Sequence, residues 1–175
     1  MEIFRTIESI PSYKDSIVTI GTFDGCHRGH QDIIKKVIYN AELCNTKSIL
    51  ITFDPHPRHV LQSDYKIPIL MHINRKLDFI KSFNLDAVLV IPFNKDFSKV
   101  SAYDFLNGII LKHLNAKKII VGYDHHFGHN REGSPEYLKK LSKDKNYDLE
   151  IVEPIKDREM IISSTHIRES IKKGF

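Results

Sequence analysis

The stretch SIVTIGTFDGCHRGHQDII, residues 16–34, joins a short apolar run to an amphipathic pattern through a glycine-marked turn. Residues 16–20 are rich in β-branched side chains and predict a buried strand. After the turn, apolar residues recur at helical spacing, at Ile33, Ile34, Val37, Ile38 and Ala41. A second β-branched run, SILITF (48–53), follows this helix. The sequence therefore predicts a strand–helix–strand unit at the start of the chain.

The same alternation continues to the C-terminus. The further elements that we expect are strands over 87–91, 118–122 and 149–153, a helix over 102–114, and helices beginning at Ser134 and near Ser163. The strand-like runs lack strict alternation of apolar and polar residues, so both faces of the sheet should be covered. The fold class predicted is α/β, a Rossmann-like parallel sheet with helices on both faces.

Composition limits the classes of protein to which the chain can belong. Its 175 residues, 41% hydrophobic and 27% charged, fit one globular domain over residues 1–175. No apolar run approaches the ~20 residues that span a bilayer, and the N-terminus lacks a signal-peptide pattern. The net charge of +4 is not gathered into a basic stripe. We therefore expect a cytoplasmic protein that binds neither membrane nor nucleic acid.

The glycines of GTFDG suit a turn that approaches a ligand closely. Gly21 and Gly25 tolerate positive φ, and the turn leads into a helix N-terminus whose free amides and dipole favour an anion. An ordinary strand-to-helix turn would show the same glycines. They do not decide between the two interpretations.

His27 and His30 favour the anion site. They lie three residues apart on one face of the first helical turn, where charged imidazoles are disfavoured unless an anion is bound. Two imidazoles could donate hydrogen bonds to phosphate oxygens and stabilise the charge that grows on them. Surface histidines are one alternative, and zinc bound with Cys26 is another. However, residues 26 and 27 point apart on a helix, and the HExxH pattern is absent.

A second anion-binding pattern is ISSTHIR, residues 162–168. Ser163, Ser164 and Thr165 offer hydroxyls where a helix begins, and Arg168 lies three residues past Thr165. Hydroxyls, a helix start and a guanidinium group together could hold an anion. Helix capping with a solvated arginine explains the pattern equally well.

Two more polar turns follow predicted strands, TFDPHP (52–57) and GYDHHFGHNREG (122–133). In parallel sheets, ligands bind beyond the carboxyl ends of the strands, where the strand order reverses. FNKDFS (93–98) also follows a strand, and its two phenylalanines could belong to the core or contact a flat ring. The convergence of these turns on one edge predicts a ligand site there.

Together these motifs resemble a known family. GTFDGCHRGH is similar to the HxGH signature of the nucleotidyltransferase superfamily, and ISSTHIR is similar to its ISSTxIR signature. With ITFDPHP and VGYDHHFGHNREG, they resemble the FMN adenylyltransferase domain of bacterial FAD synthetase. The resemblance runs from about Ile17 to Lys173. His125 departs from it, because the family commonly has phenylalanine there.

The resemblance implies transfer of AMP from ATP to FMN, which gives FAD and pyrophosphate with Mg²⁺ as the accompanying ion. It also implies a C-terminal riboflavin kinase domain in a full-length parent, and that domain is not present in this chain. The implied catalytic residues are His27, His30 and Arg168. The other implied ATP-binding residues are Gly21, Thr22, Phe23, Gly25, Gly122, Asp124, Ser163, Ser164 and Thr165. The implied flavin-binding residues are Asp54, Pro55, His56, Pro57, Phe93 and Phe97. No protein-bound metal site is expected.

Three alternatives remain at this point. Another member of the superfamily would transfer AMP or CMP to a different acceptor phosphate. A non-catalytic flavin or nucleotide sensor would bind without releasing pyrophosphate. A zinc hydrolase would carry stoichiometric metal.

Overall fold

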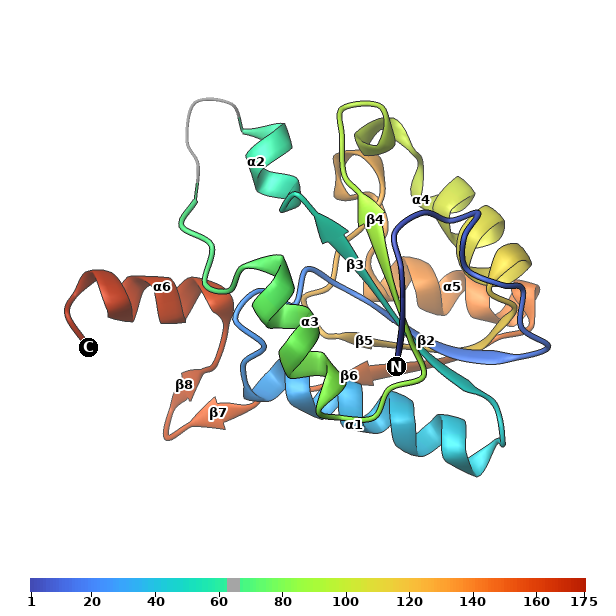
Figure 1. The fold of residues 1–175 in the computed structure, drawn as a ribbon, viewed down its shortest axis with the longest axis horizontal. Coiled ribbons are helices and arrows are strands. Elements are labelled where there is room, and N and C mark those ends of the chain that lie inside the picture. The colour runs from blue at the N-terminus through green and yellow to red at the C-terminus, as the bar shows by residue number, and fades with distance from the viewer. Residues whose placement is uncertain (63–66) are drawn as a thin grey trace.

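The computed structural model describes residues 1–62 and 67–175, and its centre is a six-stranded sheet in the order β1-β4-β3-β2-β5-β6 (Figure 1). The strands are β1 (Glu2–Phe4), β2 (Ser16–Ile20), β3 (Lys47–Asp54), β4 (Ala87–Pro92), β5 (Ala116–Gly122) and β6 (Asp148–Val152). Within this sheet, all the strand pairs are parallel. The predicted fold class and five predicted strands are confirmed. The strand missed is β1, whose three residues are too short to show a pattern.

The helices are α1 (Arg28–Leu43), α2 (Pro57–Leu61), α3 (Ile73–Lys81), α4 (Ala102–Asp104), η2 (Phe105–His113), α5 (Pro135–Lys145) and α6 (Ser164–Lys172), with short turns η1 (Phe97–Lys99) and η3 (His129–Arg131). The helix predicted over 102–114 is confirmed as α4 and η2 together, and η2 is wound as a π-helix: the Leu114 amide bonds to the Ile109 carbonyl. Helices α2 and α3 and the hairpin β7 (Lys156–Asp157) to β8 (Met160–Ile161) were not predicted.

Alternate residues of each central strand face opposite layers. In β2, Val18 and Ile20 point into a core that contains Leu106 and Leu138, from η2 and α5. Ile17 points into a second core with Val37 of α1. Figure 1 shows the corresponding layers, with α1 and α3 on one face of the sheet and α4 and α5 on the other. Both faces are buried, and therefore the strands read as continuous apolar runs.

Strand order places the predicted ligand edge. The chain passes from β2 to β3 and β4 on one side, and then crosses to β5 and β6 on the other. The order thus reverses between β2 and β5, and the crevice expected of such sheets lies at their carboxyl ends. The turns after β2, β3 and β5 are GTFDG, DPHP and GYDHH. All three meet at this edge, as the sequence predicted.

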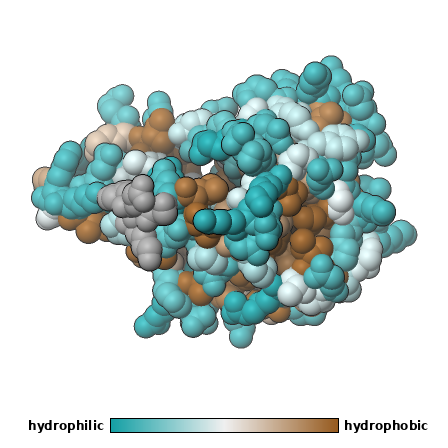
Figure 2. Space-filling view, turned by 90° about the horizontal axis from the view of Figure 1, so that it is seen from above, coloured by the Kyte–Doolittle hydropathy of each residue, from teal (hydrophilic) through white to brown (hydrophobic). Residues whose placement is uncertain are grey.

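Helix α6 lies apart from these layers. It projects from the sheet at the left of Figure 1, and none of its residues is buried. The view from above, onto the face that carries α2, shows mainly hydrophilic side chains with apolar patches between them (Figure 2). Among the described residues, no helix is both long and apolar enough to cross a membrane.

Candidate active site

The turn after β2 is tightly folded. The Gly21 amide donates to the Ile51 carbonyl at 3.0 Å, which continues the β2–β3 pairing into the turn. Phe23, Gly25 and Cys26 then have positive φ, of 49°, 78° and 41°. The φ of 78° at Gly25 disfavours any side chain, and a Cβ there would also crowd Leu70, with Cδ1 at 2.9 Å. The Phe23 ring is 1% exposed and packs into the core.

Two side chains that the sequence did not single out hold this turn by hydrogen bonds to its backbone. Lys76 Nζ and Thr52 Oγ1 both donate to the Thr22 carbonyl, at 2.7 and 3.2 Å. Lys76 is 5% exposed, and burial lowers the pKa of its amine. Lys76 belongs to α3, where Ile73, Leu77 and Ile80 recur at helical spacing. That spacing is the signal by which the helix could have been found.

The two signature histidines stack on each other at the N-terminus of α1. Their ring centroids are 3.6 Å apart with an interplanar angle of 20°. Burial, followed by the charges of His27 and Lys76, lowers the pKa of His30 to about 3. Burial also lowers the pKa of His27, against the opposing effect of Asp124 and Asp24. Both imidazoles are therefore neutral near pH 7.

Each of these imidazoles has one ring nitrogen without a hydrogen-bond partner among the described residues. In His27 and in His30 that nitrogen is Nδ1, and it is buried. Buried polar atoms are rarely left unpaired, because desolvation is then not compensated. A pair of such atoms beside a helix N-terminus is consistent with a site that a ligand completes.

Cys26 does not support the zinc alternative. Its thiol donates to the Phe23 carbonyl at 3.3 Å, and burial raises the pKa of the thiol to about 11. Zinc binds the thiolate form, which this environment disfavours. Within residues 1–62 and 67–175, no three His, Cys, Asp or Glu side chains gather closely enough to hold a metal ion.

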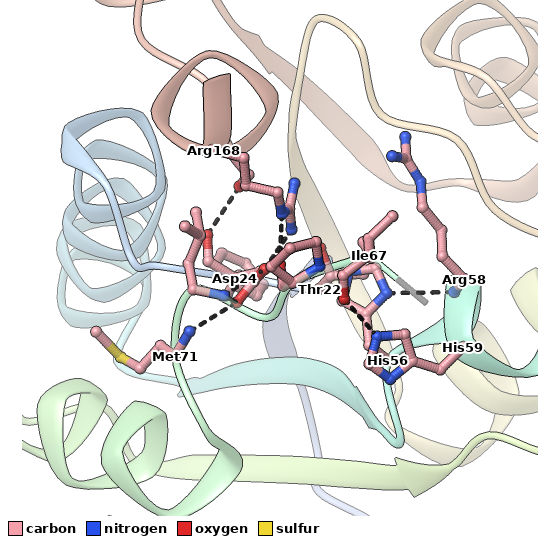
Figure 3. A network of polar contacts seen from close by, with 12 residues as sticks. Thr22, Asp24, His56, Arg58, His59, Ile67, Met71 and Arg168 are labelled. Carbon is pink, nitrogen blue, oxygen red and sulfur yellow. Dashed lines mark hydrogen bonds and ion pairs between the residues drawn. The ribbon is translucent and has the colours of Figure 1, made fainter. Parts of the chain in front are cut away.

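The second signature reaches the first across 140 residues of sequence. Ser163 caps α6 by accepting a bond from the His166 amide at 3.2 Å. Ser164 Oγ donates to the Asp24 carbonyl at 2.8 Å, and the Arg168 guanidinium pairs with the Asp24 carboxylate. Figure 3 shows Arg168 directed from α6 toward Asp24. The structure therefore brings together the two motifs on which the prediction depended; Thr165 lies exposed beside them.

Asp24 is the residue of this region whose importance the sequence did not reveal. It is 1% exposed, and its carboxylate accepts bonds from the Leu70 amide at 3.0 and 3.1 Å and from the Met71 amide at 3.0 Å. Asp24 stands in the GTFDG motif, but nothing in its neighbours distinguishes a buried aspartate from a turn-forming one.

The turn after β5 carries two other residues that the sequence predicts to contact the nucleotide. Gly122 ends β5, and Asp124 is exposed beyond it, with its charge close enough to His27 to raise the pKa of that imidazole. His125, the departure from the family pattern, stacks on Phe127 with centroids 5.6 Å apart and a 20° interplanar angle. A flat ring thus still fills the place where the family commonly has phenylalanine.

The predicted flavin residues gather at the carboxyl ends of β3 and β4. The rings of Phe93 and Phe97 are 5.7 Å apart, and Phe53 lies 5.7 Å from Phe93. The Phe93 amide donates to the Asp54 carbonyl at 3.1 Å, next to the cis bond between Asp54 and Pro55. These side chains form an aromatic cluster at the expected edge of the sheet.

The next two residues of this turn, His56 and Pro57, begin α2. His56 caps the helix through Nδ1, which accepts from the Arg58 amide at 3.2 Å, and Pro57 is the first helical residue. Burial lowers the pKa of His56 to about 4, and the charges of Asp24 and Arg168 also act on it. This turn and the Asp24–Arg168 pair therefore belong to one electrostatic environment (Figure 3).

A cavity of about 510 Å³ lies next to His27, on the side of α3 and α6. Its lining includes Gln31, Met71, Phe79 and His166. None of the predicted flavin residues lines it. The aromatic cluster is therefore not part of this cavity.

These features define a class of protein. A doubly wound parallel sheet carries neutral imidazoles, hydroxyls and a guanidinium beside two helix N-termini, at the point where strand order reverses. Such donors suit a polyphosphate and offer no nucleophile poised beside a base. The arrangement is that of a nucleotidyltransferase.

Comparison with known proteins agrees with this class. A model of the FAD synthetase family matches residues 9–166, and the chain belongs to that family. It is 33% identical over 175 residues to a bifunctional riboflavin kinase/FMN adenylyltransferase of Buchnera aphidicola, covering 99% of this chain and 56% of the relative. The protein of the same description from Escherichia coli K12 is 28% identical, covering 98% of this chain and 55% of the relative. The chain thus spans about half the length of these relatives.

A solved structure shares the fold. It is a chain from Streptococcus pneumoniae described as a macrolide-efflux protein, with a TM-score of 0.82 and 27% identity, covering 97% of this chain and 55% of that chain. That description names a different activity from that of the relatives above. The structural likeness supports the fold. The family match confirms the resemblance that the signatures indicated.

Proposed function

We propose that this chain transfers AMP from ATP to FMN, releasing pyrophosphate and forming FAD. Residues 1–175 would be the FMN adenylyltransferase unit, and riboflavin kinase activity would belong to a C-terminal domain of a full-length parent. The observation that carries the proposal is the contact between the two signatures, Ser164 to the Asp24 carbonyl and Arg168 to its carboxylate. Family membership and the names of the relatives supply the acceptor.

The reaction asks the protein to position groups and to stabilise charge. An oxygen of the FMN phosphate attacks the α-phosphorus of ATP, and the bond to the β-phosphate oxygen breaks so that pyrophosphate leaves. The acceptor is already a nucleophile, and the barrier lies in bringing two anions together. His27 and His30, as neutral donors at a helix N-terminus, would bind phosphate oxygens at the reacting centre. Ser163, Ser164, Thr165 and Arg168 would hold the β- and γ-phosphates.

Mg²⁺ would enter with ATP, since this ion is usually bound by substrate phosphates and one or two carboxylates. The exposed Asp124 carboxylate, whose charge acts on His27, fits that requirement. The ion would neutralise part of the phosphate charge when bound. Gly122, Asp124 and the turn that they begin would also contact the adenosine.

On the flavin side, the aromatic cluster offers a surface for a flat ring. Phe93 and Phe97 would contact the isoalloxazine, and the turn that contains Asp54, Pro55, His56 and Pro57 would bound the site. This turn lies within electrostatic reach of Arg168. The FMN phosphate could therefore approach the ATP site from the β3 edge.

The direct test is to incubate the protein with ATP, Mg²⁺ and FMN and to measure FAD by chromatography and pyrophosphate by a coupled assay. Equal amounts of both products are expected. Phosphopantetheine and glycerol phosphate, offered as competing acceptors, should be poor substrates, and CTP should be a poor donor. Transfer to either acceptor in preference to FMN would contradict the proposal. Binding of FMN and ATP without pyrophosphate release would indicate a sensor instead.

A further inference from the structure

Asp24 is the point at which three separate segments meet. Its carboxylate accepts from the amides of Leu70 and Met71 and from Arg168, and its own carbonyl accepts from Ser164. The Asp24 side chain is 2% exposed and that of Arg168 is 10% exposed, so the ion pair is shielded from solvent. Figure 3 shows Asp24 between Arg168 and the backbone of Met71.

The carboxylate is fixed by more than its partner. Both carboxylate oxygens have partners: the Leu70 amide is shared between them, the Met71 amide donates to Oδ1, and the Arg168 guanidinium donates to Oδ2. Asp24 is also two residues from Thr22, whose carbonyl is held by Lys76. Asp24 therefore belongs to the same hydrogen-bonded turn that leads to His27.

Two residues of helix α6, Ser164 and Arg168, contact Asp24. None of its residues is buried. The polar contacts that join Ser164 and Arg168 to the rest of the described chain end on Asp24 or on the Pro68 carbonyl, which accepts from Arg168 Nε at 2.7 Å. The guanidinium thus donates through Nε and Nη2 to two acceptors along one edge of its plane, and an arginine has five N–H donors.

From this arrangement we infer that Asp24 is a positioning residue for ATP binding: it holds the Arg168 fork so that the remaining N–H donors face the triphosphate. The inference rests on the proposed function. It assigns Asp24 no contact with the nucleotide. Loss of the carboxylate should therefore weaken ATP binding only through Arg168.

The test is a double-mutant cycle of Asp24→Asn, Arg168→Ala and the double variant, with equilibrium binding of MgATP measured by calorimetry in the absence of FMN. Asp24→Asn should weaken binding roughly tenfold, as expected when one charge-assisted hydrogen bond is misdirected. In the Arg168→Ala background the same substitution should have almost no further effect. With FMN present, the KM for ATP should rise while the KM for FMN stays unchanged.

Lys76→Met is the matched control. Lys76 supports the same turn through Thr22 but has no bond to Arg168. A variant that loosens the whole turn should reduce ATP binding by the same factor in the wild-type and Arg168→Ala backgrounds, which is additive behaviour. We expect additive behaviour for Lys76→Met but not for Asp24→Asn. If Asp24→Asn is also additive, or binds ATP as the wild type does, the inference is wrong.

Arg168→Lys covers the case in which Asp24→Asn does not fold. The ammonium would still neutralise the buried carboxylate but lacks the planar fork. This variant should fold and bind ATP as weakly as Arg168→Ala; wild-type binding would overturn the inference. A wild-type protein that fails to bind ATP or to form FAD would instead remove the proposed function. If the wild-type protein forms FAD but the effects of Asp24→Asn and Arg168→Ala on ATP binding are additive, only the role of Asp24 is removed.

Discussion

The two halves of the candidate phosphate site are held in different ways. The turn between β2 and α1 is part of the core, and its Phe23 and Cys26 are each 1% exposed. Helix α6, which carries the other half, has no buried residue and contacts the turn through Asp24. Close packing therefore fixes the imidazoles of His27 and His30, whereas polar contacts with Asp24 position Ser164 and Arg168.

The largest expected effect tests the packed half. His27→Ala and His30→Ala should each fold and lose about 10²–10³-fold in the rate of FAD formation, because each removes a preorganised donor from the reacting centre. Steady-state assays with ATP and FMN, together with thermal unfolding, measure both properties. His113→Ala is a control, since His113 bonds to the Ile10 carbonyl away from the site. Near-normal turnover by both signature variants would refute their assignment.

A substitution in the α6 half of the site should weaken ATP binding more than it slows the chemical step. Arg168→Ala should raise the KM for ATP roughly 10- to 100-fold with a smaller change in kcat, because charge-assisted hydrogen bonds to the β- and γ-phosphates are lost. The melting temperature should also fall, since Asp24 loses its counter-ion. An unchanged KM and kcat would remove Arg168 from the site.

A pair of stability variants sharpens the comparison further. Gly25→Ala should lower the global free energy of unfolding by about 1–2 kcal/mol, because its φ of 78° disfavours a side chain and the new Cβ would meet Leu70. Ser163→Ala removes the N-cap of α6 and should cost about 1 kcal/mol of helix stability.

The second loss should be local, because no residue of α6 is buried. Urea unfolding would then detect Gly25→Ala clearly and Ser163→Ala weakly, while hydrogen exchange would show faster exchange of the α6 amides in Ser163→Ala. Equal effects on global unfolding would mean that α6 is integrated into the core.

A further effect concerns pH. Burial lowers the pKa of His125 to about 4, compared with about 6.5 in the unfolded chain. The unfolded state then binds the proton first, so stability present above pH 6.5 is lost as the pH falls toward 4. His125→Phe should flatten the dependence of the unfolding free energy on pH by roughly 1 kcal/mol per pH unit in that window. Denaturant unfolding between pH 4.5 and 7 measures it, with the exposed His126→Phe as control; identical curves for His125→Phe and wild type would contradict the assignment.

Prediction succeeded where periodicity was long. The β-branched run at 16–20 and the apolar spacing of Ile33, Ile34 and Val37 placed β2 and α1, and Ser134 marked the start of α5. Helix α3 was missed because its nine residues lie in a polar segment, although Leu77 and Ile80 are buried. The three residues of β1 are too few to show a pattern, and β1 becomes a strand by pairing with β4, more than 80 residues away.

The candidate site divides in the same way. The sequence pointed to His27, His30 and Arg168, because their residue types and spacing suit a polyphosphate. It could not reveal the roles of Asp24 and Lys76, because an aspartate in a glycine turn and a lysine on a polar helix are ordinarily solvated. Their burial depends on which segments pack against them.

The amino-acid sequence determined the parallel α/β architecture, the edge at which a ligand should bind and the family to which the signatures belong, since periodicity and motif spacing are local properties of the chain. Only the tertiary structure decided how the two signatures are joined, through the buried Asp24, whose carboxylate bonds to the segment at residues 70–71 and to Arg168 of α6. The physical reason is that a buried charge must find its partners across the fold, and those partners lie 46 to 144 residues away along the chain.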